Sequence, residues 1–231
     1  MTPPRGPNTV TFAILPVKRF SLAKERLGDQ LAAGTRRALA EAMLTDVLLA
    51  LRRTEAIQEV LVVTSEPVAD ALGRGYGAHV IEDTEEAGQS AATVIGIAAA
   101  LDAGATRVLL IPGDVPALAP AELAELLGRP TAGGSVIVVP DRHATGTNAL
   151  VLTPPDAIEP AFGPDSRARH EQAAAAARLP CSVEELPTLA LDVDTVEDLD
   201  ELRLLLAARR GGAANTRGML SRLAGRERGP A

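Results

Sequence analysis

The sequence predicts an α/β fold, with a single domain built on a mainly parallel, mixed sheet that is flanked by helices. Short apolar runs alternate along the chain with longer segments in which apolar residues have helical spacing. The apolar runs are nearly continuous, as expected of strands that are covered on both faces. The 231 residues, 46% of them hydrophobic, suffice for one domain of this kind.

The first part of the chain predicts four strands that are separated by helices. The expected strands are 10–15, 60–64, 79–81 and 107–111, and the expected helices are 36–53, 67–74, 90–103 and 120–127. Thr35 is a candidate N-cap for the first of these helices. Pro67 and Pro120 suit the first turns of two others, and Gly104 ends the alanine-rich one.

The second part predicts a hairpin followed by two helices. The strands are 136–139 and 148–152, joined by a polar turn, and a further short strand is expected over 189–193. Helices are expected over 166–178 and, capped by Thr195, over 196–210. The domain is therefore expected to span 10–210, between a flexible tail over 1–9 and a mostly disordered, Arg- and Gly-rich tail over 211–231 in which a short helical piece is expected near 219–223.

Composition argues against several classes of function. The net charge of −7 and the 2% aromatic content disfavour a nucleic-acid partner. No apolar run reaches the roughly 18 residues of a membrane span, and the N-terminus lacks the pattern of a signal peptide, so a cytoplasmic protein is expected. The single cysteine, Cys181, excludes an intramolecular disulfide and a cysteine zinc cluster.

A basic loop follows the first predicted strand. It contains Pro16, Val17, Lys18, Arg19, Lys24 and Arg26. Such a loop can hold a polyphosphate, because lysine supplies a point charge and arginine binds phosphate oxygens in pairs; a solvated basic loop is the alternative. Neither a GxxxxGK[ST] loop nor a GxGxxG turn follows this strand, which argues against P-loop and dinucleotide-binding folds.

Three carboxylates lie at predicted strand ends. Asp114 follows a buried strand and Gly113, whereas Asp192 and Asp194 flank one residue of a short strand and therefore share a face. Carboxylate oxygens are ligands that Mg²⁺ accepts, so the three could hold that ion. The alternatives are local: Asp114 as a turn residue, Asp194 as a helix cap and Asp192 as a surface residue.

Three small, polar turns could bind anions. Gly88 and Ser90 begin an alanine-rich helix, whose amide groups and dipole favour negative charge; an ordinary capped helix is the alternative. Thr147, Gly163 and Ser166 lie in two further glycine-containing turns that can donate hydrogen bonds to a phosphate. The three histidines are expected to be structural or surface residues rather than catalysts.

Five motifs together resemble a known family. In order they read AILPVKRFSLAKERL, LLIPGDVPAL, PDRHATGTNAL, FGPDSRARH and LDVDTVEDL. From about Val10 to Leu206 the chain resembles the CofC/FbiD family, the guanylyltransferases of coenzyme F420 biosynthesis. The resemblance implies a nucleotidyltransferase fold of the GT-A or MobA-like kind. It also implies Mg²⁺ as cofactor, and transfer of GMP from GTP to the phosphate of a three-carbon acid with release of pyrophosphate.

The resemblance also implies roles for individual residues. The Mg²⁺ ligands would be Asp114, Asp192 and Asp194, and the acceptor would be held by Thr147, Gly163 and Ser166. The GTP phosphates would be neutralised by Lys18, Lys24 and Arg26, and the catalytic residues would be Lys18, Lys24 and Asp114. The rest of the nucleotide site would be formed by Pro16, Val17, Gly88, Ser90 and Gly113. Ser90 departs from the family pattern, since many relatives have asparagine at the position that would contact guanine.

The FGPDS stretch resembles the bacterial pattern for phosphoenolpyruvate, which is therefore the expected acceptor. 2-Phospho-L-lactate and 3-phospho-D-glycerate stay open as acceptors. A partner is implied as well, because the unstable product would pass to the transferase that follows in the F420 pathway. Two other functions are considered. A sugar-phosphate or molybdopterin nucleotidyltransferase usually carries a GGxSxRMG-like loop, which this chain lacks. A non-catalytic GTP-binding module would not need the three carboxylates.

Overall fold

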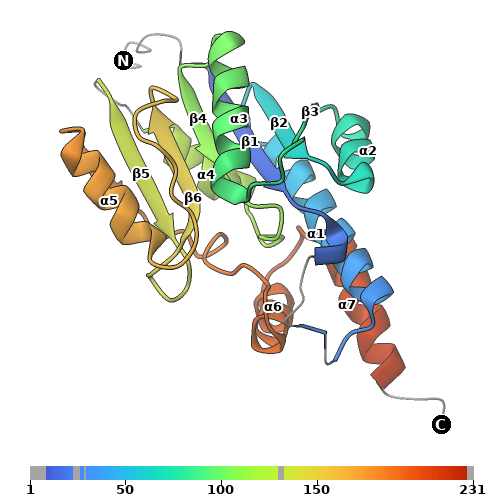
Figure 1. The fold of residues 1–231 in the computed structure, drawn as a ribbon. Helices are drawn as coiled ribbons and strands as arrows, with labels where there is room; N and C mark the ends of the chain where they lie inside the picture. The colour runs from blue at the N-terminus through green and yellow to red at the C-terminus, as the bar shows by residue number, and fades with distance from the viewer. Residues whose placement is uncertain (1–8, 23–26, 29, 130–132, 228–231) are drawn as a thin grey trace.

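The computed structural model describes residues 9–22, 27–28, 30–129 and 133–227, and it folds them as one α/β unit (Figure 1). The strands are β1 (Thr11–Val17), β2 (Glu59–Thr64), β3 (His79–Glu82), β4 (Arg107–Leu110), β5 (Ser135–Pro140), β6 (Thr147–Thr153) and β7 (Cys181–Val183). The helices are a short 3-10 helix (Phe20–Leu22), α1 (Ala33–Arg52), α2 (Pro67–Gly75), α3 (Gln89–Asp102), α4 (Pro120–Leu127), α5 (Ser166–Ala176), α6 (Val196–Ala208) and α7 (Ala214–Glu227).

The strands form a mixed sheet in the order β3-β2-β1-β4-β6-β5-β7. β3, β2, β1 and β4 run parallel, whereas β6 is antiparallel to both β4 and β5, as the predicted hairpin requires. From β1 the chain builds outward to β2 on one side and later returns to β4 on the other. The ends of β1 and β4 therefore form a switch point, where sheets of this type bind their ligands.

Helices cover both faces of the sheet because the strand residues alternate between two apolar clusters (Figure 1). Ala13 of β1 belongs to the cluster that contains residues of α1, α2 and α4, and Ile14 belongs to the cluster with α3 and α5. Gly96 lets α3 lie close to the sheet, since a Cβ there would be 2.4 Å from Ile14 Cγ2. This close packing fixes the N-terminus of α3 at the end of β1.

The C-terminal segment differs from the flexible tail that the sequence predicts. Residues 214–227 form helix α7, which lies along α1 (Figure 1), and its Leu220 and Leu223 are buried in a third cluster with residues of α1 and α6. Many glycines and arginines hide this apolar spacing in the sequence. Residues 1–8, which make up most of the predicted N-terminal tail, lie outside the described residues.

Two smaller predictions are also corrected. Helix α1 begins at Ala33, so Thr35 lies inside it, and the capping residue is Ala32, which makes no side-chain capping hydrogen bond. Residues 189–193 form a loop rather than a strand, while the edge strand β7 forms at Cys181–Val183. The prediction of Thr195 as the N-cap of α6 is confirmed, and Asp198 completes a capping box with it.

Replacing Asp46 by alanine is expected to lower the free energy of unfolding by about 2 kcal/mol. Asp46 is a buried residue of α1 that accepts hydrogen bonds from the backbone N–H groups of Asn215 (3.1 Å) and Thr216 (2.7 Å) at the start of α7. Urea unfolding would measure the loss, with Asp70→Ala as the control. Asp70 pairs with Arg74 on the surface, so its removal should cost less than about 0.5 kcal/mol. Equal losses would mean that Asp46 does not hold α7.

Candidate active site

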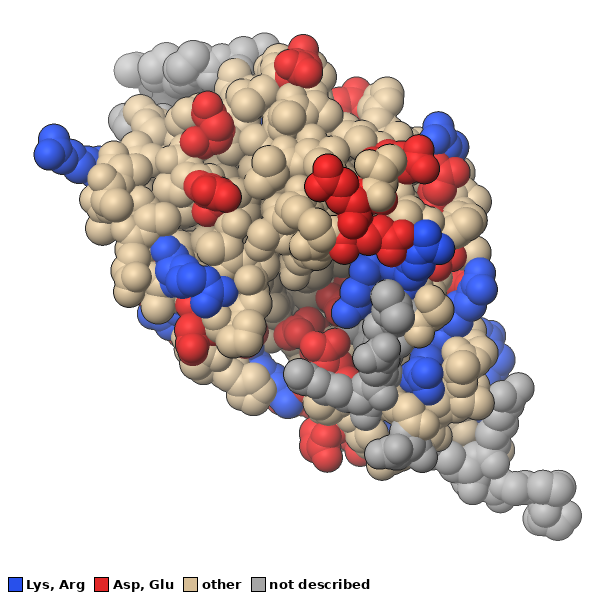
Figure 2. All heavy atoms as spheres, viewed as in Figure 1, with Lys and Arg blue, Asp and Glu red and all other residues tan. Residues whose placement is uncertain are grey.

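A cleft of about 770 Å³ opens where β1 and β4 end and β6 begins. Figure 2 shows the hollow, with acidic side chains inside it and basic side chains on one rim. The residues that the sequence predicts for the site and that line this cleft are Pro16, Val17, Lys18, Gly88, Gly113, Asp114, Thr147, Gly163, Ser166, Asp192 and Asp194. Lys24 and Arg26 lie outside the described residues.

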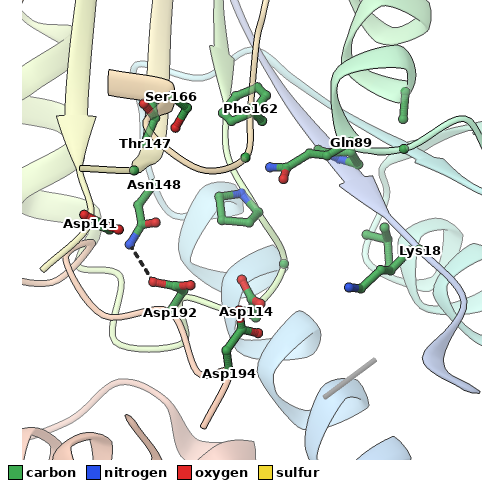
Figure 3. Close-up of a pocket in the computed structure, with 18 of the residues that line it drawn as sticks. Lys18, Gln89, Asp114, Asp141, Thr147, Asn148, Phe162, Ser166, Asp192 and Asp194 are labelled. Atoms are coloured by element: carbon green, nitrogen blue, oxygen red, sulfur yellow. Dashed lines mark hydrogen bonds between the residues drawn. The ribbon is translucent and has the colours of Figure 1, made fainter. Parts of the chain in front are cut away.

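Ser90 does not line the cleft, which corrects its predicted place in the nucleotide site. Its hydroxyl oxygen accepts a hydrogen bond from the backbone N–H of Phe162 at 2.9 Å, and this bond joins α3 to the loop before α5. The neighbouring Gln89 lines the cleft instead, and Figure 3 shows its amide directed into the open space. The GQS motif therefore borders the site through Gly88 and Gln89.

The three predicted carboxylates lie close together on one side of the cleft, as Figure 3 shows. Asp114 follows β4, whereas Asp192 and Asp194 belong to the loop before α6. Asn148, the second residue of β6, fixes this loop, because its side-chain amide donates to the Leu189 carbonyl (2.8 Å) and to Asp192 Oδ1 (3.2 Å). The loop thus brings Asp192 to Asp114 without the strand that the sequence predicts.

The electrostatics of this group favour a bound cation. Burial raises the pKa of Asp192 to about 6, and the negative charges of Asp114 and Asp194 add to the increase, while the hydrogen bond from Asn148 opposes it. Carboxylate oxygens suit Mg²⁺, and a divalent cation would relieve the repulsion among them. Within the described part of the chain, however, no three acidic, histidine or cysteine side chains converge closely enough to hold a metal ion. The carboxylates are therefore candidate ligands that would have to turn toward one another.

Arg142 joins the β5–β6 loop to the start of α6. Its guanidinium forms an ion pair with Asp198 at 2.6 Å and another with Glu201, and its backbone N–H donates to the Ala190 carbonyl at 2.8 Å. Asp198 Oδ2 in turn accepts from the backbone N–H of Asp194 at 3.0 Å. Sequence reasoning missed Arg142 and Asp198; the T-x-x-D spacing of a capping box is the signal that could have found Asp198.

The opposite end of the cleft is lined by small and polar residues. Thr147 begins β6 and Ser166 begins α5; both side chains are buried, and Figure 3 shows them on the same wall. Gly163 has φ +109°, a conformation that side chains rarely adopt, so glycine suits this turn. Thr147 and Ser166 line the cleft next to the N-terminus of α5, whose backbone N–H groups suit an anion.

Lys18 and Arg19, on the wall that faces the carboxylates, differ in their contacts. Arg19 donates to both carboxylate oxygens of Glu86, at 2.6 and 3.0 Å, and this contact raises the pKa of Arg19 and lowers that of Glu86. Figure 3 shows the amine of Lys18 directed into the cleft, across from the carboxylates. A polyphosphate between these walls would therefore meet Lys18 on one side and a cation held by the carboxylates on the other.

Comparison with known proteins identifies the family. The family model described as "Guanylyl transferase CofC like" matches residues 11–223. This chain belongs to the CofC-like guanylyl transferase family. It is 58% identical over 214 residues to the phosphoenolpyruvate guanylyltransferase of Conexibacter woesei, covering 92% of this chain and 96% of the relative. It is 35% identical to the 3-phospho-D-glycerate guanylyltransferase of Colwellia psychrerythraea, covering 84% and 92%.

Solved structures of the same fold include a nucleotidyl transferase. A nucleotidyl transferase from Methanothermobacter thermautotrophicus matches with a TM-score of 0.62 and 18% identity, covering 88% of this chain and all of that one. A Mycobacterium tuberculosis protein solved in complex with manganese matches with a TM-score of 0.52 and 20% identity, covering 84% and 98%. The predicted nucleotidyltransferase fold is confirmed. None of the helices in the described part of the CofC-like protein is long and apolar enough to cross a membrane.

Proposed function

We propose that this protein transfers GMP from GTP to phosphoenolpyruvate, giving enolpyruvyl-diphospho-5′-guanosine and pyrophosphate. The observation that carries the proposal is that one cleft is lined by Lys18 on one wall, by the three carboxylates on another, and by Thr147, Gly163 and Ser166 on a third. These are the features that a triphosphate, a divalent cation and a small anionic acceptor require. The 58% identical relative supports phosphoenolpyruvate as the acceptor.

The proposed reaction is an in-line displacement at the α-phosphorus of GTP. An oxygen of the acceptor phosphate forms a bond to that phosphorus, and the bond to the β-phosphate oxygen breaks, so that pyrophosphate leaves. The acceptor oxygen is already anionic, and no side chain has to remove a proton from it. Lys18 neutralises charge on the departing pyrophosphate, while Thr147 and Ser166 orient the acceptor through hydrogen bonds.

The donor chemistry of Asp114, Asp192 and Asp194 fits Mg²⁺, and these three residues would hold it. When bound, the ion supplies positive charge to the phosphate oxygens. Within the chain itself, Asn148 keeps Asp192 in place for this role, and the Arg142–Asp198 ion pair fixes the loop that carries Asp194.

A second acceptor, 3-phospho-D-glycerate, is favoured by one observation. A relative that is 35% identical over most of both chains carries that activity in its name. The two acids share a phosphate and a carboxylate on three carbons, so the wall of Thr147, Gly163 and Ser166 suits either. The same cleft would serve 2-phospho-L-lactate, whereas a sugar phosphate lacks the carboxylate.

Pyrophosphate release from the purified protein tests the proposal. GTP and Mg²⁺ are supplied with phosphoenolpyruvate, 3-phospho-D-glycerate, 2-phospho-L-lactate or a hexose phosphate in separate reactions, and the F420-pathway transferase with its deazaflavin acceptor is included to consume the unstable product. Release with phosphoenolpyruvate that stops on adding EDTA is the expected result. Release with another phosphoacid corrects the acceptor, and release with the hexose phosphate alone contradicts the proposal.

A further inference from the structure

His170 of α5 is fully buried behind the cleft wall that contains Thr147 and Ser166, and it is hydrogen-bonded through both ring nitrogens. Its Nε2 lies 2.9 Å from the backbone nitrogen of Ala161, and its Nδ1 lies 3.0 Å from the hydroxyl oxygen of Thr147. The ring of Phe162 contacts the imidazole edge-on, with 5.3 Å between the ring centroids. The histidine therefore connects α5, the loop before α5 and the start of β6.

These two contacts determine where the imidazole carries its proton. A backbone N–H can only donate, so Nε2 must accept from Ala161 and carries no hydrogen. A neutral imidazole has one N–H group, which is then at Nδ1 and donates to Thr147 Oγ1. Burial, together with the charge of Arg169, lowers the pKa of His170 to about 4, so the ring is neutral at physiological pH.

The tautomer decides which way the Thr147 hydroxyl donates. Because Oγ1 accepts from His170, its own hydrogen is not used in that contact and can be donated to a ligand in the cleft that Thr147 lines. With the opposite tautomer the hydroxyl would have to donate to Nδ1, and it would then present only lone pairs to the cleft. An anionic oxygen is attracted by the first arrangement and repelled by the second.

We propose that His170 is a positioning residue, which acts through Thr147 so that the hydroxyl of Thr147 donates its hydrogen to an anionic oxygen of the acceptor phosphoacid. The inference rests on the proposed function for the identity of that ligand. The contact between Thr147 and His170 itself belongs to the folded protein. His170 touches no substrate in this scheme, and its effect is confined to the acceptor and does not extend to GTP.

Two substitutions separate the donor role of His170 from its packing role. In His170→Asn the amide group lies near the position of Nδ1 and can still donate to Thr147. In His170→Gln the amide lies near Nε2, so it can accept from Ala161 but does not reach Thr147. We expect His170→Gln to raise the KM for the phosphoacid about tenfold and to leave the KM for GTP within about twofold of the wild-type value. For His170→Asn, both KM values should stay within about threefold of the wild-type values.

Further variants show whether the effect passes through Thr147. Thr147→Val removes the hydroxyl and should itself raise the KM for the phosphoacid. Adding His170→Gln to Thr147→Val should then cause no further increase, because the orienting bond has already been lost. His79→Asn is the matched control: His79 is exposed, begins β3 and does not line the cleft, so neither KM should change.

The tautomer can also be measured directly in the wild-type protein, by ¹⁵N NMR of the histidine side chains at pH 7. A neutral ring with the proton on Nδ1 supports the proposal. A proton on Nε2, or a cationic ring, overturns it, and so does a KM for GTP that rises together with the KM for the phosphoacid in His170→Gln. If wild-type protein turned over no phosphoacid, the proposed function would fail, and the NMR result would still decide the hydrogen-bond assignment.

Discussion

Replacing Asp192 by asparagine is expected to lower kcat for GMP transfer about a thousandfold, which corresponds to about 4 kcal/mol of transition-state stabilisation. Asp192 is central to the group of carboxylates, because Asp114 and Asp194 both raise its pKa. Asparagine keeps the side-chain oxygen that accepts from Asn148, so the loop is preserved. What is lost is the negative charge that would bind a divalent cation.

The same substitution should leave the metal-free protein as stable as before, or more stable. Burial and two negative neighbours raise the pKa of Asp192 to about 6 in the folded protein, above its ordinary value of 3.8. The folded chain therefore binds a proton more tightly than the unfolded chain, and the wild type loses stability as the pH rises through about 6. The asparagine side chain carries no charge and lacks that loss, so the free energy of unfolding of the variant at pH 7 should not fall.

Turnover with saturating Mg²⁺ and urea unfolding with EDTA would test both parts. Asp114→Asn should behave like Asp192→Asn in turnover. Asp102→Asn is the control, since Asp102 is exposed at the end of α3 that is far from the cleft, and it should change neither quantity. A kcat near the wild-type value in Asp192→Asn would remove Asp192 from the proposed metal site. A large loss of stability would indicate a structural role instead.

The fold was predictable because it follows from local apolar patterns. Buried strands such as β2 and β5 appear as continuous β-branched runs, and proline marks the start of α2 and α4. The β5–β6 hairpin follows from two such runs around one polar turn. Each of these features depends on residues that are close together in the sequence, so no knowledge of tertiary contacts was needed.

The elements that were predicted wrongly depend on contacts between residues that are far apart in the sequence. Helix α7 is capped by Asp46, which lies 169 positions before Asn215, and no pattern within 211–231 shows that contact. Residues 189–193 have the composition of a strand, but the backbone N–H groups of Leu189 and Ala190 bond to the Leu186 carbonyl, and Asn148 takes the Leu189 carbonyl. These bonds hold the segment in a loop, and they arise only once β6 is in place.

In the site, too, local motifs were predicted correctly, whereas contacts between distant residues were not. The motifs located the residues that line the cleft, because loops at strand ends of an α/β sheet converge on one edge. The residues that hold those side chains in place were not recognised. His170 was expected to be an ordinary structural histidine, and Arg142 was not singled out; their partners, Thr147 and Asp198, lie 23 and 56 positions away along the sequence.

Replacing Lys18 is the other change expected to have a large effect, and the sequence itself gives a reason to expect that arginine will not substitute for it. Of the 23 lysine and arginine residues in the chain, the lysines are Lys18 and Lys24, both between the end of β1 and the start of α1 in the sequence. Elsewhere the chain uses arginine for positive charge. A lysine at the cleft of a chain that otherwise uses arginine indicates a need for a compact ammonium group rather than for charge alone.

Lys18→Met should lower kcat/KM for GTP about a hundredfold, since it removes the ammonium group that points into the cleft and that the proposed function assigns to the leaving pyrophosphate. Lys18→Arg keeps the charge but places a larger, planar group between the walls, and it should still cost about tenfold. Arg53→Met, at the exposed end of α1, is the control and should leave kcat/KM unchanged. Full activity in Lys18→Arg together with loss in Lys18→Met would mean that charge alone is required, and the scarcity of lysine elsewhere would then have no bearing on the site.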